Sequence, residues 1–279
     1  MIDDAEMKIS HVIRGVDHIS NTPKQILLIE ALNLRMPLYA HLPLILAPDR
    51  TKFSKRHGAA SVGEYRELGY APEALINFLA LLGWSPTDNQ EIFSREELID
   101  KFSLERVQKS PAIFDVTKLE WMNSSYIKKM SPEELYSSAR LFLPKTKKTK
   151  SYILKVLALE RPRLRKLSEL ADATNYFFNE PEYEPELLRW KGMTNDELLK
   201  SLEQSLVLLE KNGKLARGDL EKTFLKAAGQ WPDRGKLLWP LRVTLSGKKA
   251  SPGPFEIMEI IGISETRKRL RLALNKINN

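Results

Sequence analysis

A short cationic loop contains the residue types best suited to chemistry in this sequence. It reads Lys52-Phe53-Ser54-Lys55-Arg56, with two lysines three positions apart and a serine hydroxyl between them. Cations on such a loop can stabilise the negative charge that develops on a pyrophosphate while its bond breaks. Basic pentapeptides are common, so a solvated turn is the alternative interpretation from composition alone.

The residues before this loop predict the elements that position it. The branched run 9–14 predicts a strand, Asn21-Thr22-Pro23 is typical of a helix start, and the apolar run 42–46 predicts a buried parallel strand. Strand, helix and strand form one βαβ unit, and open α/β sheets bind ligands at the carboxyl ends of their strands. One such unit is too small to form a doubly wound sheet, so the sheet is either incomplete or needs a partner.

The remainder of the chain has helical apolar periodicity. Ser94, Ser131 and Thr194 are each followed three positions later by glutamate, which is the capping-box pattern of a helix start. We therefore expect a mainly α fold with a small α/β portion at its N-terminus. Helices are predicted at 72–82, 255–261 and 267–277, and surface breaks at 143–151 and 179–185.

Positive charge is concentrated in parts of the chain. The 279 residues carry 44 Lys+Arg against 36 Asp+Glu, a net charge of +8. Between Arg140 and Lys166 there are ten basic residues and a single acidic one, Glu160. Such clustering is typical of a phosphate-binding surface, and a solvated basic helix and loop is the alternative.

Composition also excludes several classes of protein. The absence of cysteine excludes disulfides, thiolate metal sites and a cysteine nucleophile. No apolar run approaches the roughly 20 residues of a membrane span. The opening Met-Ile-Asp-Asp-Ala-Glu lacks the basic and apolar regions of a secretory signal. We therefore expect a cytoplasmic protein of two or three packed units, with no membrane partner.

Several ordered motifs together resemble the glutamyl-tRNA synthetases, which are class I enzymes with a Lys-Met-Ser-Lys-Arg-type loop. Asp3-Asp4, then Ile9-Ser-His-Val-Ile-Arg-Gly15, then Asp17-His-Ile-Ser-Asn-Thr-Pro-Lys-Gln25 lead at matching spacing into Lys52–Arg56. The resemblance covers essentially the whole chain. Its later motifs lie at 69–84, 109–115, 119–123, 241–247 and 251–255.

This resemblance assigns roles to residues near the loop. It implies that Lys52, Ser54, Lys55 and Arg56 are catalytic residues that stabilise the transition state of amino-acid adenylation. Phe53 stands where Met, Leu or Ile is usual and keeps an apolar anchor.

The resemblance also implies the substrate-binding residues. Arg14 would pair with the carboxylate of glutamate through a fork that lysine does not provide, and Asp17, His18 and Lys55 would bind ATP. Val16 stands where the family usually has an acidic residue, and this departure concerns the geometry of the ATP-binding side of the site.

For the helical half, the resemblance implies contacts with the anticodon of tRNA(Glu). Arg163 would read the last anticodon base, and Arg242 and Ser251 would contact the first. The basic stretch around Arg163 fits backbone contacts that position the RNA.

The resemblance further implies four regions. Residues 1–58 would be the C-terminal part of a Rossmann-type catalytic domain, 59–130 a helical stem-contact domain, and 131–190 and 191–279 two anticodon-binding subdomains. The family reaction uses glutamate, tRNA(Glu), and ATP with Mg²⁺, and we expect no protein-bound structural metal.

The family's His-Ile-Gly-His-type loop and its acceptor-binding domain precede the Asp-Asp motif. We therefore expect a fragment or split half of a glutamate–tRNA ligase that binds tRNA but does not activate glutamate alone, with a separately encoded N-terminal half as a possible partner. The alternatives are a non-catalytic tRNA-binding module and a paralogue that also charges tRNA(Gln).

Overall fold

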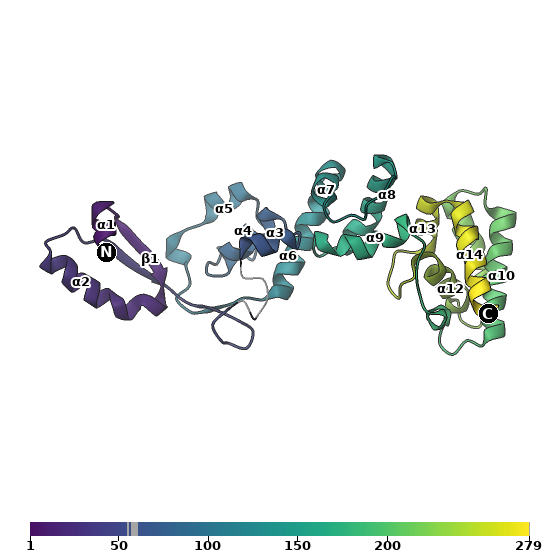
Figure 1. The fold of residues 1–279 in the computed structure, drawn as a ribbon, viewed down its shortest axis with the longest axis horizontal. Coiled ribbons are helices and arrows are strands. Elements are labelled where there is room, and N and C mark those ends of the chain that lie inside the picture. The colour runs from purple at the N-terminus through teal and green to yellow at the C-terminus, as the bar shows by residue number, and fades with distance from the viewer. Residues whose placement is uncertain (55, 57–60, 279) are drawn as a thin grey trace. The chain divides into compact units, whose positions relative to one another are not determined.

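The structure is a computed structural model that describes residues 1–54, 56 and 61–278. Its chain forms two compact units, Met1–Tyr126 and Ile127–Asn279. Helices predominate in both, and the described strands are short and lie in the first unit (Figure 1). The predicted fold class, mainly α with a small parallel α/β portion, is confirmed.

A two-stranded parallel sheet begins the first unit. Strand β1 (His11–Gly15) pairs with β2 (Leu38–Leu42), so that Arg14 lies opposite His41. Helix α2 (Thr22–Ala31) connects them and has proline in its first turn, where its missing N–H costs nothing. The predicted order of strand, helix and strand is therefore present, but the second strand lies at Leu38–Leu42 and not at 42–46.

The second strand was predicted at the wrong position. The expected strand 42–46 is divided: Leu42 ends β2, and β3 (Ile45–Leu46) pairs in parallel with β4 (Ala112–Ile113) in a separate sheet. Pro43 lies at the division, and proline cannot donate a hydrogen bond to a ladder. Apolar composition alone did not reveal that one run serves two sheets.

The helices of the first unit enclose an aromatic core. Tyr65, Phe78 and Phe114 are buried together with Met122. The buried amide of Asn77 accepts hydrogen bonds from the Phe93 backbone N–H at 2.9 Å and from the Tyr126 hydroxyl at 2.7 Å. This unit contains α1 (Ile2–Glu6), α3 (Val62–Glu67), α4 (Pro72–Leu81), α5 (Arg95–Lys101) and most of α6 (Val116–Lys129).

The parallel sheet of the first unit has exposed apolar side chains. Ile13 of β1 is 59% exposed and Leu38 of β2 is 66% exposed. Parallel strands are normally buried on both faces, so this exposure is unusual. Among the described residues, the exposed large apolar side chains all lie in the first unit apart from Leu141, Val207, Leu215 and Leu225.

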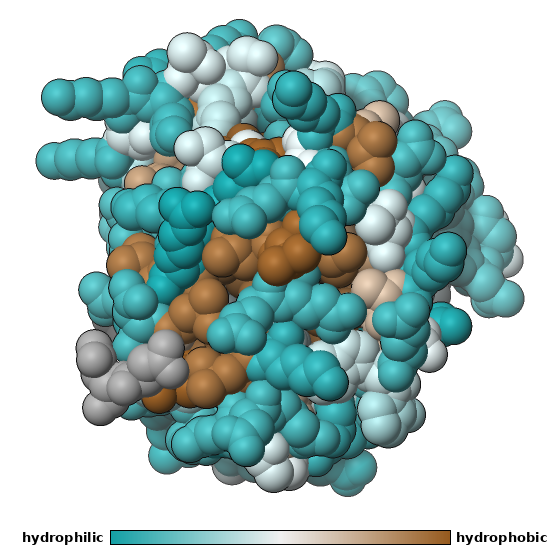
Figure 2. All heavy atoms as spheres, turned by 90° about the vertical axis from the view of Figure 1, so that its right-hand side faces the viewer, coloured by the Kyte–Doolittle hydropathy of each residue, from teal (hydrophilic) through white to brown (hydrophobic). Residues whose placement is uncertain are grey.

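The second unit is built only of helices among its described residues. Its larger core includes Leu202, Phe224, Leu241 and Leu270, each fully buried. On the face shown in Figure 2, hydrophilic residues predominate around a limited apolar band. The helices are α7 (Pro132–Ala139), α8 (Lys150–Glu160), α9 (Leu170–Phe178), α10 (Asn195–Asn212), α11 (Arg217–Ala228), α12 (Gly235–Ser246), α13 (Pro254–Ile261) and α14 (Ile263–Asn278).

Helix starts were predicted well. The side chains of Ser94, Ser131 and Thr194 each accept a hydrogen bond from the backbone N–H of the following glutamate, and each glutamate bonds back to its cap residue. All three predicted capping boxes are therefore confirmed. A fourth box at Ser61 and Glu64, which begins α3, was not predicted.

The stretch 179–185 is not simply a surface break. Pro181 is buried and Tyr183 packs against the core of the second unit. Gly247, with a φ of 67°, lies so close that a Cβ there would be 2.9 Å from the carbonyl oxygen of Glu182. The Glu- and Pro-rich composition predicted a linker, but the chain here is held against the end of α12.

Candidate functional site

Arg14 lies at the carboxyl end of β1 in a set of hydrogen bonds. Its Nη2 donates to Thr22 Oγ1 at 2.7 Å and to Gln25 Oε1 at 2.8 Å, and its Nε donates to His41 Nε2 at 3.4 Å. The guanidinium carbon also lies 5.4 Å from the centre of the Tyr39 ring. Within the described contacts, Nη1 keeps its two N–H groups for a ligand. A fixed guanidinium with free donors is well suited to a carboxylate.

Thr22 and His41 complete this set. Thr22 is buried, and its hydroxyl lies 2.8 Å from His41 Nε2. The register of β1 and β2 thus places His41 opposite Arg14. The first turns of α2 supply Thr22 and Gln25.

Asp17 and Lys52 meet although they are far apart in the chain. Lys52 Nζ lies 2.8 Å from Asp17 Oδ2, and both side chains are well exposed. The hydrogen bond from Lys52 is the largest influence on Asp17 and lowers the pKa of its carboxyl below the ordinary 3.8. The sequence assigned Asp17 to the nucleotide side and Lys52 to the catalytic loop, and the structure brings them together.

The rest of the cationic loop is only partly described. Phe53 stacks on Phe114 with ring centroids 4.4 Å apart, which anchors the loop to the core of the first unit. Ser54 is half-buried and Arg56 is exposed. Lys55 lies outside the described residues. His18 is exposed, and its backbone carbonyl accepts a 3.4 Å hydrogen bond from Thr22 Oγ1.

A second candidate site lies in the second unit. Arg163 and Ser251, which are far apart in sequence, line one polar cavity of about 280 Å³. Lys248 also lines it and pairs with Asp172 at 2.5 Å. The guanidinium of Arg163 is partly exposed and its Nε lies 3.6 Å from Glu160 Oε2. The cavity thus presents both a cationic donor and acceptor groups to a polar ligand.

Arg242 lies close to this cavity. Burial, followed by the positive charge of Arg163, lowers the pKa of its guanidinium, so the two arginines are near enough to repel. Its Nη2 donates to the Lys249 carbonyl at 3.0 Å, and its guanidinium carbon lies 4.6 Å from the centre of the Trp239 ring. The three residues predicted to contact RNA bases therefore lie in one neighbourhood.

The basic stretch 140–166 contributes exposed cations to the same unit. Lys145, Lys147, Lys148 and Lys155 are all exposed. Arg161 differs, because its Nη1 donates to the Met130 carbonyl at 3.0 Å and so has a structural contact. Most of the predicted positive band is thus available to a polyanion.

Comparisons with known proteins agree with this division. The family model of the catalytic domain of class I tRNA synthetases (E and Q) matches residues 1–121, and an anticodon binding domain model matches residues 128–274. The glutamate–tRNA ligase of Moorella thermoacetica is 43% identical over 282 residues. The glutamate–tRNA ligase 1 of Fervidobacterium nodosum is 44% identical over 277 residues.

The chain belongs to the class I tRNA synthetases (E and Q).

A solved member of this family has the same fold. The crystal structure of a glutamate tRNA ligase from Elizabethkingia meningosepticum, in complex with its amino acid, aligns with a TM-score of 0.81 at 31% identity. The aligned region covers 98% of this chain and 58% of the Elizabethkingia chain. The Moorella and Fervidobacterium ligases are likewise matched over 57% of their lengths, by 97% and 99% of this chain. The chain therefore spans somewhat more than half of its relatives.

Sequence reasoning missed part of the arginine site and part of the cavity. Thr22, Gln25 and His41 were not assigned to a site, although Thr22-Pro23 was recognised as a helix start. Assigning His41 required the strand register, which composition does not give. Glu160 was noted only as the single acid within a basic band, and that isolation was the available signal.

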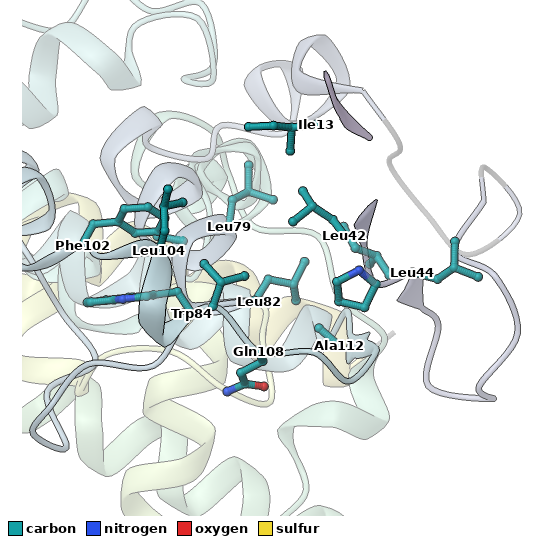
Figure 3. Close-up of a pocket in the computed structure, with 15 residues that line it drawn as sticks. Ile13, Leu42, Leu44, Leu79, Leu82, Trp84, Phe102, Leu104, Gln108 and Ala112 are labelled. Carbon is teal, nitrogen blue, oxygen red and sulfur yellow. The ribbon is translucent and has the colours of Figure 1, made fainter. Parts of the chain in front are cut away.

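An apolar cavity of about 320 Å³ also lies in the first unit. In Figure 3, Leu42, Leu79 and Leu82 turn toward the same space, and Trp84 and Phe102 lie beside them. These residues come from β2, α4 and the segments that follow α4 and α5. The cavity has few polar groups, so it does not resemble a site for glutamate or a nucleotide.

Two further features concern metals and membranes. In the part of the chain that the structure describes, no group of three or more His, Cys, Asp or Glu side chains is placed to hold a metal ion. Class I synthetases use ATP with Mg²⁺ as a substrate complex, so a resident metal is not needed to explain the family. Among the described helices, none has the length and apolar character to span a membrane.

Proposed function

We propose that this chain acts in the attachment of glutamate to tRNA(Glu) in the cytoplasm. Its second unit binds the anticodon arm, and its first unit contributes residues to the catalytic domain. One observation carries the proposal: Arg163 and Ser251 line one polar cavity, close to Arg242, inside the segment that matches an anticodon binding domain. Exposed lysines of the basic band supply the phosphate contacts that such binding requires.

On the amino-acid side, Arg14 binds the carboxylate of glutamate. Thr22, Gln25 and His41 hold the guanidinium in one orientation, so little freedom is lost when a ligand binds. The similar ligase from Elizabethkingia was crystallised with its amino acid, which supports an amino-acid site in this fold.

On the nucleotide side, Asp17 and His18 bind ATP, and Lys52, Ser54, Lys55 and Arg56 stabilise the charge of the departing pyrophosphate. ATP brings Mg²⁺ as its counter-ion. Lys52 is held by Asp17 at 2.8 Å, and this exposed pair is weak enough to exchange for a phosphate. The four-region division at residues 58, 130 and 190 belongs to the same proposal.

Activation of glutamate requires a further polypeptide segment that covers the first unit. The exposed Ile13 and Leu38, together with the apolar cavity, support such a covering. The relatives carry additional sequence of sufficient length to provide it. This segment is either continuous with the chain or a separately encoded N-terminal half.

The first experiment measures two activities of the purified chain. We expect it to bind a tRNA(Glu) transcript, with affinity that falls steeply between 50 and 200 mM salt, on the order of 10³-fold for about six phosphate contacts. We expect no glutamate-dependent ATP–pyrophosphate exchange. Exchange by the chain alone would show that the covering segment is unnecessary, and absence of tRNA binding would reject the anticodon role.

The second experiment supplies the part of a relative that this chain does not match. The part of the Moorella thermoacetica ligase that this chain does not match is co-expressed with it, and exchange activity is expected to appear. Leu38→Lys, on the exposed sheet, should prevent this recovery without affecting tRNA binding. Leu141→Lys is the matched control, because Leu141 is 92% exposed in the second unit. Equal loss in both variants would contradict docking on the sheet.

A stand-alone tRNA-binding module is the second candidate, and the exposure of the sheet argues against it. It would be favoured if co-expression restored no exchange while tRNA binding persisted. A paralogue that also uses tRNA(Gln) is tested by the relative binding of the two tRNAs. Arg163→Gln should reduce the preference for tRNA(Glu), and an unchanged preference would reject the role given to Arg163.

A further inference from the structure

A buried carboxylate, that of Glu160, is among the groups that line the polar cavity. Glu160 is the last residue of α8 and is 2% exposed. Burial disfavours its charged form, and the carboxyl end of a helix carries partial negative charge that disfavours it again. A neutral residue of similar volume would cost less at this position.

The contacts of Glu160 suggest a function for it. Its Oε1 accepts a 2.6 Å hydrogen bond from the hydroxyl of Tyr176, which is itself 2% exposed. Its Oε2 faces Arg163 Nε at 3.6 Å. The tyrosine thus fixes one oxygen of the carboxylate, and the other oxygen faces the arginine that lines the cavity.

The arginine lies among charges of both signs, because Glu169 and Asp172 line the cavity together with Arg165 and Lys248. Asp172 already pairs with Lys248, and Glu160 is the acid that faces Arg163 Nε. The charge of Arg163 acts on Arg242, and Lys248 lines the same cavity. Without a nearby negative charge, a partly exposed guanidinium would turn toward water and away from the other cations. Since Arg163 directly follows α8 in a single turn, Glu160 can hold it through a short connection.

We propose that Glu160, fixed by Tyr176, is a positioning residue that holds the guanidinium of Arg163 in the orientation that reads the last anticodon base. This inference rests on the proposed function. It extends that function, because it assigns base discrimination to a buried pair that does not itself contact RNA. Arg163 keeps its other N–H groups for the base edge.

The test compares two RNAs that differ in one base. Glutamate codons begin with guanine, so the last anticodon base is cytosine, whereas that of tRNA(Gln) is guanine. The full chain is titrated with a tRNA(Glu) transcript and with the same transcript carrying guanine there. We expect Glu160→Gln to reduce the preference for cytosine about tenfold, within the range of one bidentate base contact. Its thermal unfolding temperature at pH 7 should not fall.

Two further variants separate positioning from structure. Glu160→Gln in an Arg163→Gln background should cause no additional loss of preference, since the carboxylate acts through the arginine. Tyr176→Phe keeps the ring and removes the hydroxyl, and should reduce the preference about threefold. It also provides a readout if Glu160→Gln does not fold.

Several outcomes would overturn the inference. They are an unchanged preference in both single variants, an equal loss in the Arg163→Gln background, and equal weakening of both RNAs with a lower unfolding temperature. If the unmodified chain binds both transcripts equally, base reading by Arg163 fails and the inference fails with it. If the unmodified chain binds neither, the proposed function itself is rejected.

Discussion

The two units differ in how completely they bury their apolar residues. In the second unit the apolar faces of the helices meet in two cores, and few large apolar side chains are exposed among the described residues. In the first unit the parallel sheet leaves Ile13 and Leu38 open, beside an apolar cavity. The second unit therefore buries most of its large apolar side chains, whereas the first leaves apolar side chains exposed on its sheet.

Asp17 of the first unit and Glu160 of the second also differ in their exposure to solvent. Asp17 is exposed beside a lysine, which lowers its pKa, whereas burial raises the pKa of Glu160. The charged form of Asp17 is stabilised by Lys52, and because the pair is exposed, the carboxylate can exchange this partner for solvent or a ligand. Glu160 is constrained and holds a fixed partner. An open exchanging pair fits a reaction site, and a buried pair fits a recognition site.

Core truncation should give the largest contrast between the units. Phe224→Ala removes a fully buried ring from the second unit and should lower the free energy of unfolding by about 3–5 kcal/mol. Leu38→Ala, at an exposed position of the first unit, should change it by less than about 0.5 kcal/mol. Hydrogen exchange measured by mass spectrometry assigns each effect to its unit. Comparable losses would mean that Leu38 is already packed in solution.

The hydrogen bonds of Arg14 should contribute less than the core but more than an isolated surface contact. Thr22→Val removes a hydroxyl that bonds both Arg14 and His41, and should cost about 1–3 kcal/mol. Thr174→Val in the second unit is the control, because within the described contacts its hydroxyl bonds the Leu170 carbonyl of its own helix. Denaturant titration monitored by exchange in β1 and α9 compares them. A larger loss at Thr174 would contradict the importance of the Arg14 contacts.

The pH dependence of stability should have opposite signs at the two carboxylates. Asp17 has a lowered pKa, so its stabilisation is present above pH 3.8 and is lost as the pH falls through the lowered value. Glu160 has a raised pKa, so its stabilisation is present below pH 4.5 and is lost as the pH rises through the raised value.

Replacing each carboxylate by its neutral amide tests the two opposite pH dependences of stability. Relative to the unmodified chain, Asp17→Asn should lose stability as the pH rises from 3 to 7, while Glu160→Gln should gain it. Unfolding free energies measured across this range provide the comparison. Trends of the same sign would show that the two environments are not as different as their geometry indicates.

A glycine substitution should give the smallest effect. A Cβ at Gly15 would lie 2.4 Å from Asp17 Oδ1, so Gly15→Ala must shift that carboxylate, and we expect the shift to weaken the contact of Oδ2 with Lys52. The pKa of Asp17 should then return toward 3.8, as an NMR titration of its carboxyl carbon would detect. Gly218→Ala is the control, because a Cβ at Gly218 in α11 meets nothing within 4 Å. An unchanged Asp17 titration in Gly15→Ala would contradict the short contact.

Local patterns predicted the fold better than they predicted the sites. Capping boxes gave the starts of α5, α7 and α10, because the cap and its glutamate are close in sequence. The division at Pro43 was missed because which sheet a strand joins depends on distant partners, here Ala112 and Ile113. The family motifs indicated Arg14 and Lys52, but not the contacts that hold them.

The recognition site shows the same limit. Arg163 and Ser251 were identified separately from motifs, and only folding brings them to one cavity. Glu160 was visible in the sequence as a lone acid among cations. Its burial and its contact with Tyr176 depend on the packing of α9 against α8, which no local pattern records.

The division of the run 38–46 at Pro43 has a consequence for the spacing of substrates. His41, which contacts Arg14, lies two residues before Pro43, and Leu46, which is bridged to Lys52, lies three residues after it. The residues proposed to hold the amino acid and the pyrophosphate are thus attached to the two ends of one short backbone segment. Covalent geometry therefore sets the reach between carboxylate and phosphate. An insertion of one residue beside Pro43 would alter that reach without changing any side chain that touches a substrate.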